Sequence, residues 1–139
     1  MAALDRTGAF LARIAQPIPA LAIRRSPIGD EFGVRNGVVI NALYDDFSVM
    51  DANARFWPQT ERLKAALLAA ILTGESQYYS MAHAAASSFL PYLNTPLAGL
   101  WFDQQLPSGA LLDSPAPAST FDHLVGAIAA LHPALGSRL

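Results

Sequence analysis

One stretch of the sequence has the spacing of a long helix that buries one face. Its apolar side chains recur at helical intervals and are Leu63, Ala66, Leu67, Ala70 and Ile71. Pro58 suits the first turn, where its missing N–H costs nothing, and Gly74 is a natural C-terminal stop. A helix with an apolar face of this kind needs other elements to cover it, so we expect a mainly helical fold.

Two more helices are expected after this one. The first begins near residues 75–76, and Pro91 is expected to bend its last turn. Residues 94–117 are rich in glycine and proline and are expected to form a loop. The second helix follows this loop, capped by Ser119 or Thr120, and Pro133 is expected to end it.

The first third of the chain is harder to interpret. Residues 1–32 predict a helix near 5–16, followed by a loop at residues 26–29, where a serine, a proline and a glycine occur. Residues 37–50 resemble a short β-hairpin with its turn at residues 45–46. An isolated hairpin is marginally stable, so we expect it to lie against helices.

The composition allows two interpretations. Apolar residues make up 53% of the chain and charged residues 14%, against about a quarter in typical globular proteins. This fits an alanine-rich helical protein, or a part of a larger fold whose apolar faces pack on helices that lie elsewhere. We favour the second interpretation because the motifs below agree with it.

The same counts argue against several functions. The net charge is −2 without a basic stripe, so nucleic acid is not an expected partner. There is no cysteine, and the three histidines lack the spacing of zinc ligands, so we expect no metal and no cofactor. The longest strongly apolar run, residues 65–72, is too short to cross a membrane. We expect no signal peptide either, and therefore a cytoplasmic location.

The first cluster that could carry chemistry lies at residues 55–61. Trp57 and Glu61 are four residues apart, so they share a helix face and could offer an aromatic platform beside a carboxylate. That combination suits a sugar, which has apolar C–H faces and hydroxyl groups. The alternative is an ordinary helix start, with Trp57 in the core and Glu61 at the positive helix end.

Two further clusters follow. Trp101 and Asp103 lie between glycine and proline signals and could line a pocket, or the tryptophan could anchor a long loop. His123 follows a proline-rich segment, within the start of a helix whose positive end favours an uncharged imidazole. Such a base could take a proton from a carbon next to a sugar carbonyl, or the ring could simply bond within its own turn. His83 and His132 are expected to be structural.

Together the three clusters resemble the C-terminal part of the N-acylglucosamine 2-epimerase family, which includes mannose isomerases, cellobiose 2-epimerases and chains labelled mannose-6-phosphate isomerase. The residues that carry the resemblance are Ala-Arg-Phe-Trp-Pro-Gln-Thr-Glu-Arg-Leu-Lys-Ala (54–65), Gly-Leu-Trp-Phe-Asp (99–103) and Pro-Ala-Pro-Ala-Ser-Thr-Phe-Asp-His-Leu (115–124). The resemblance covers roughly residues 33–132. Residues 1–32 match poorly, so we divide the chain into this segment and residues 33–139.

The resemblance implies an all-α fold, the C-terminal part of an (α/α)6 barrel decorated by a short β-hairpin. It implies a small-molecule sugar as substrate and proton transfer beside the sugar carbonyl through an enediol-like intermediate. Two histidines share this work in the family, and His123 falls on the later one. Trp57, Gln59, Glu61 and Trp101 fall in motifs that line or support the pocket.

One departure limits what this chain is expected to do. The family's earlier catalytic histidine belongs to a helix that should precede residue 1, so the chain is expected to be incomplete and inactive alone. An alternative is a non-catalytic helical module that binds a partner or itself through an exposed apolar face. A third hypothesis is a glycosidase, for which Glu61 and Asp103 are the candidate carboxylates.

Overall fold

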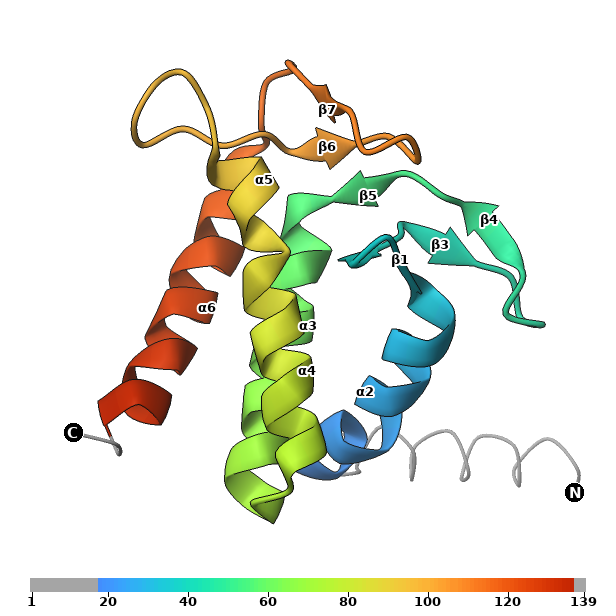
Figure 1. Cartoon of the computed structure of the whole chain (residues 1–139), viewed down its shortest axis with the longest axis vertical. Helices are drawn as coiled ribbons and strands as arrows, with labels where there is room; N and C mark the ends of the chain where they lie inside the picture. The colour runs from blue at the N-terminus through green and yellow to red at the C-terminus, as the bar shows by residue number, and fades with distance from the viewer. Residues whose placement is uncertain (1–17, 137–139) are drawn as a thin grey trace, which may run out of the picture.

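The computed structural model describes residues 18–136 of the chain, so the helix expected near residues 5–16 lies outside the described part. Its helices are α2 (Ile18–Gly33), α3 (Phe56–Thr73), α4 (Ser76–Ser87), α5 (Phe89–Leu93) and α6 (Ala118–Gly136). Helix α3 lies in the middle and packs against α2, α4 and α6 (Figure 1). The predicted helical class is therefore confirmed. Within residues 18–136, no helix is both long and apolar enough to span a membrane.

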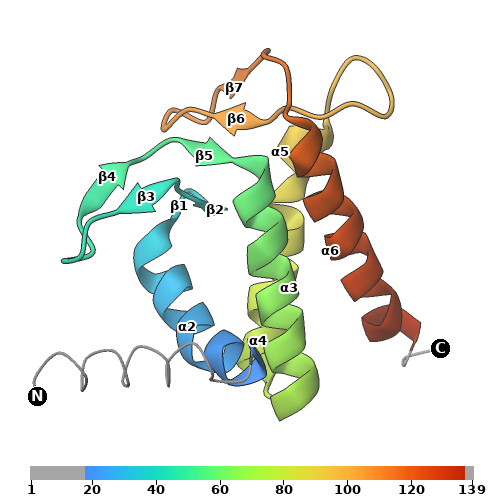
Figure 2. The ribbon, with the colours of Figure 1, turned by 180° about the vertical axis from the view of Figure 1, so that it is seen from behind.

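Short antiparallel strands gather at one end of the helices, where α3 and α6 begin (Figures 1 and 2). They are β1 (Val34–Arg35), β2 (Val38–Val39), β3 (Ala42–Leu43), β4 (Val49–Asp51), β5 (Ala54–Arg55), β6 (Gln104–Gln105) and β7 (Leu111–Leu112). β1 pairs with β2, β3 with β4, and β6 joins β5 to β7. The strands thus bring segments far apart in the sequence to the starts of two helices.

The region of the expected hairpin holds two hairpins. The turn at residues 45–46 joins β3 to β4, as predicted. The valines of β2, however, pair with the preceding strand, β1, in an antiparallel hairpin. Its turn is formed by Asn36 and Gly37, whose φ angles are 52° and 84°. An Asn-Gly pair favours this tight turn because both residues tolerate that conformation.

The loop expected at residues 26–29 is helical, which corrects the prediction. Pro27 lies inside α2. A proline has no N–H, so the carbonyl four residues earlier, that of Ile23, loses its usual donor. The hydroxyl of Tyr78, on α4, donates to that carbonyl at 3.1 Å. A partner from another helix therefore compensates for the bond that the proline removes.

Other predicted boundaries also need correction. The helix that starts at Ser76 is broken at Ser88 rather than bent at Pro91, so α4 and α5 are separate. α6 continues past Pro133 to Gly136, because a proline that removes one backbone donor need not end a helix. The expected loop 94–117 contains β6 and β7, whose pairing comes from β5 and not from any local pattern.

The core lies along α3, and its aromatic rings gather at the start of the helix. Phe56 is fully buried, stacks on Tyr92 with ring centroids 5.0 Å apart, and meets the edge of Phe89 at 5.3 Å. Leu63 continues this buried face along α3. The helix ends as predicted at Gly74, whose φ is 71° and whose N–H donates to the carbonyl of Ala70. The core thus fixes the first turns of α3, which carry the candidate site.

Candidate functional site

Asp103 fastens the starts of α3 and α6 to each other. Its backbone carbonyl accepts a hydrogen bond from the N–H of Phe56, and its carboxylate accepts one from the hydroxyl of Thr120, both at 2.9 Å. Since α6 begins at Ala118, Ser119 and Thr120 lie inside it and neither is the expected helix cap. Asp103 is 1% exposed, so its carboxylate does not face a cleft as the glycosidase hypothesis requires.

This arrangement places His123 of α6 against α3. The Nδ1 atom of His123 lies 2.6 Å from the Oε1 atom of Glu61, and the ring centroids of His123 and Trp57 are 5.3 Å apart. The side chains of His123 and Glu61 are 38% and 41% exposed, and Trp57 is 40% exposed. An imidazole, a carboxylate and an indole from two helices therefore meet at the surface, and the alternatives of a core tryptophan and a histidine bonded within its own turn do not apply.

Glu61 also pairs with a cation on its own helix. The Nζ atom of Lys64 lies 2.6 Å from the same Oε1 atom. Partial burial acts to raise the pKa of Glu61, but the hydrogen bonds and charges of Lys64 and His123 outweigh it, so the pKa is lowered from its ordinary value. The ionised form of the carboxylate is thus favoured, and this form can accept a hydrogen bond from an N–H group of the imidazole.

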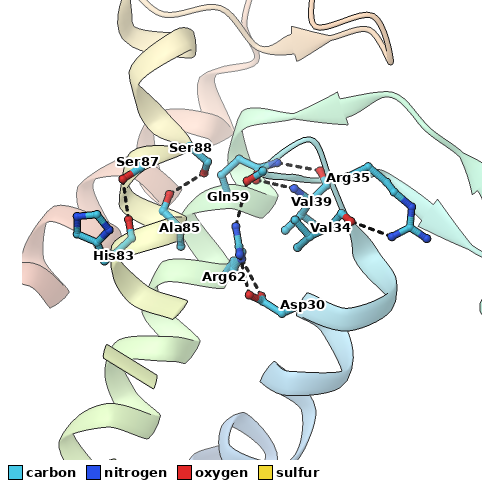
Figure 3. A network of polar contacts seen from close by, with 11 residues as sticks. Asp30, Val34, Arg35, Val39, Gln59, Arg62, His83, Ala85, Ser87 and Ser88 are labelled. Carbon is cyan, nitrogen blue, oxygen red and sulfur yellow. Dashed lines mark hydrogen bonds and ion pairs between the residues drawn. The ribbon is translucent and has the colours of Figure 1, made fainter. Parts of the chain in front are cut away.

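The side chain of Gln59 bonds to β2 instead of joining this cluster, and Figure 3 shows it beside Val39. Its side chain is fully buried, accepts from the N–H of Val39 at 2.8 Å and donates to the carbonyls of Val39 and Arg55 at 2.9 Å. It therefore bonds to β2 in the way that another strand would. One turn further along α3, Arg62 makes two 2.7 Å bonds to Asp30 of α2, so both residues attach neighbouring segments to α3.

Trp101 lies in the loop that joins α5 to β6. Its ring stacks on Phe121 at a centroid distance of 6.2 Å, and it lines an open hollow of about 830 Å³ with residues from both ends of the segment 95–116. Trp57, Glu61 and His123 do not belong to that lining. The structure brings these three residues together, whereas Gln59 bonds to β2 and Trp101 lines the separate hollow.

Lys64 was missed by the sequence reasoning, although a signal was present. Residues three apart on a helix are neighbours, so Glu61 and Lys64 could have been paired from spacing alone. That the pair lies opposite a histidine could not, because His123 comes from another helix. In the described part of the chain, no three histidine, aspartate or glutamate side chains gather in a way that could hold a metal ion.

Helices packed around α3, with this cluster at the end where α3 and α6 begin, define a mainly helical protein with a candidate acid–base site. The family model described as N-acylglucosamine 2-epimerase (GlcNAc 2-epimerase) matches residues 19–127, and the chain belongs to this family. The matched region begins inside α2 and includes Trp57, Glu61 and Trp101, as well as His123.

Individual relatives agree with the family. A protein of Rhizobium meliloti (strain 1021) named "Mannose-6-phosphate isomerase" is 45% identical over 114 residues. A crystal structure of D-mannose isomerase is similar with a TM-score of 0.67 and 23% identity, and cellobiose 2-epimerase from Spirochaeta thermophila DSM 6192 with 0.61 and 20%. These two likenesses establish the fold as part of an (α/α)6 barrel.

The chain is much shorter than these proteins. The match to the Rhizobium meliloti protein covers 76% of this chain but 30% of that protein. The structural matches cover 76% and 83% of this chain, and 28% and 30% of the mannose isomerase and the epimerase. The chain thus spans less than a third of the length of the relatives it matches.

Proposed function

We propose that this chain supplies one wall of the active site of a sugar isomerase or epimerase, with His123 as the group that moves a proton at the carbon next to the sugar carbonyl. The observation that carries the proposal is the contact of His123 with Glu61 beside the exposed ring of Trp57. The family membership and the names of the relatives support the class of reaction.

The contact with Glu61 suits a base. A carboxylate accepts a hydrogen bond, so the proton of the neutral imidazole is on Nδ1 and the lone pair is on Nε2. Nε2 can then take a proton from the sugar carbon, and the resulting imidazolium is stabilised by Glu61. Return of the proton to the neighbouring carbon, with a hydroxyl proton passing between the two oxygens of the enediol-like intermediate, gives the isomer. Delivery of a proton to the original carbon from the opposite face gives the epimer.

Trp57 gives the sugar a place to lie. Its ring is 40% exposed and adjoins the imidazole, so an apolar C–H face of a sugar can stack on it while the reacting carbon approaches Nε2. We assign Gln59 the role of holding the start of α3 and Trp101 that of shaping the neighbouring loop. No cofactor has a role in this chemistry.

The chain by itself is proposed to be inactive. Epimerisation needs proton donors and acceptors on two faces of the intermediate, and the described residues place one imidazole, that of His123, at the cluster. The second histidine of the reaction is proposed to come from the part of the barrel that the chain does not span. Purified chain mixed with mannose, fructose, N-acetylmannosamine or cellobiose should leave each sugar unchanged.

A chimaera tests the role of His123 directly. The segment of the Rhizobium meliloti protein that this chain matches is replaced by this chain, and isomer formation is followed with the same sugars and mannose 6-phosphate. His123→Gln in an active chimaera should lower kcat by at least about 100-fold, as loss of a general base does. His83→Gln, at an exposed position on α4, is the matched control and should leave kcat unchanged. Equal activity of both variants would refute the proposed base.

An exposed apolar face supports a second proposal, that the chain associates with another copy of itself. Phe121, Val125 and Ile128 lie on one face of α6 and are 53%, 47% and 57% exposed. Exposed apolar residues grouped in this way often mark contact surfaces. Self-association through α6 does not exclude the catalytic role, because His123 faces α3 instead.

A further inference from the structure

Lys64 shares one carboxylate oxygen with His123. Its Nζ atom and the Nδ1 atom of His123 each lie 2.6 Å from Oε1 of Glu61. The two nitrogens therefore cannot be farther apart than about 5 Å, a separation at which two positive charges repel appreciably even near a protein surface. The proposed base has a permanent cation as a close neighbour.

The lysine side chain is held between the two helices. A Cβ atom added to Gly126 of α6 would lie 3.5 Å from Nζ and 3.8 Å from Cδ of Lys64. The side chain thus reaches from α3 to the backbone of α6, three residues beyond His123, and it is 32% exposed. Lys64 is also the only lysine in the sequence, which makes it a selective probe.

Glu61 and Lys64 act on His123 in opposite directions. A carboxylate alone favours the imidazolium form, which cannot accept a proton, whereas a cation on the same oxygen partly neutralises the carboxylate and repels the imidazolium. Building on the proposed function, we propose that Lys64 is a positioning residue that opposes protonation of the His123 imidazole, and so favours the form that can act as a base. On α3, the charged groups near His123 are Glu61 and Lys64. On α6, the neighbouring residue Asp122 is also charged, and it is exposed.

The titration of His123 in the full chain tests this inference without turnover. Its imidazole signal is followed by NMR against pH at low salt and assigned by its loss in His123→Gln. In Lys64→Met the midpoint should rise by about half to one pH unit, and Lys64→Arg should restore it. High salt should shrink the difference. Arg55→Met, which removes an exposed cation just before α3, is the control and should leave the midpoint in place.

A second measurement needs no substitution. Coupling between two titrating sites is reciprocal, so the single lysine should sense the imidazole. With 13C-labelled lysine, the Lys64 Cε signal should show an inflection at the pH where His123 titrates, and His123→Gln should abolish it. An unchanged midpoint in folded Lys64→Met, or a Cε signal without that inflection, overturns the inference. Neither result would affect the proposed role of His123, which the chimaera tests separately. Conversely, an unchanged kcat of the His123→Gln chimaera would not affect the measured coupling between Lys64 and His123.

Discussion

At the level of single residues, the buried phenol of Tyr92 makes stability depend on alkaline pH. Burial, and then the negative charge of Asp103, raise the pKa of Tyr92 above its usual value. The neutral phenol is thus favoured in the folded state, so its stabilisation is complete below the pKa of an unfolded tyrosine, about 10, and is lost as pH rises above it.

Tyr92→Phe should therefore protect the chain in alkali. Above pH 10, the difference in free energy of unfolding between variant and parent should grow by up to about 1.4 kcal/mol per pH unit. Near pH 8 the two should be similar, because the hydroxyl makes one long contact of 3.5 Å with Gln105. Urea unfolding at both pH values measures this. Tyr44→Phe, at a 53% exposed position, should not gain with pH, and an equal gain there would contradict the explanation.

The candidate site was only partly predictable from residues. The four-residue spacing of Trp57 and Glu61 correctly predicts a shared helix face. Sequence spacing does not say which face of a helix meets another helix. It therefore could not show that Gln59, inside the same motif, bonds to a strand. The contact with His123 depends on the packing of α6 on α3, which local patterns do not encode.

At the level of elements, glycines show where local rules hold. Gly74 ends α3 with φ of 71°, a conformation that costs other residues about 1 kcal/mol or more. Gly74→Ala should therefore lower the free energy of unfolding by about 1 kcal/mol. Gly29, inside α2, has no atom within 4 Å of an added Cβ. Gly29→Ala should instead be neutral or stabilise by up to about 1 kcal/mol, because alanine is the better helix former.

Thermal unfolding followed by circular dichroism distinguishes the two substitutions. The pair is matched, since each adds one methyl group in open space and only the backbone conformation differs. A midpoint lowered equally by both would show that the added methyl group, and not the positive φ, is responsible.

Elements that rely on distant partners escaped prediction. Ser26, Pro27 and Gly29 predict a loop, yet α2 passes through them because Tyr78 bonds the carbonyl that the proline leaves free. β6 likewise forms because β5 lies beside it. In both cases a tertiary contact outweighs the local preference. The turn at Asn36 and Gly37 is different, since its signal was local and was overlooked.

At the level of the whole molecule, the sequence motifs were sufficient for the barrel class but not for its packing. Helical periodicity located α3, α4 and the start of α6, and the low share of charged residues suggested faces that this chain does not cover. The structure identifies one such face on α6. The structural relatives extend well beyond the part that this chain matches.

The exposed face of α6 leads to a last prediction, about self-association. Val125→Lys with Ile128→Lys places two charges on it without touching the buried Ala127. The sedimentation coefficient of the parent chain should rise with concentration, while that of the double variant stays constant, because a buried unpaired charge opposes association. The helical circular dichroism spectrum should not change. Ile71→Lys, at a 55% exposed position on α3, should associate like the parent. If the parent sediments as a monomer throughout, the face of α6 does not join two copies of the chain.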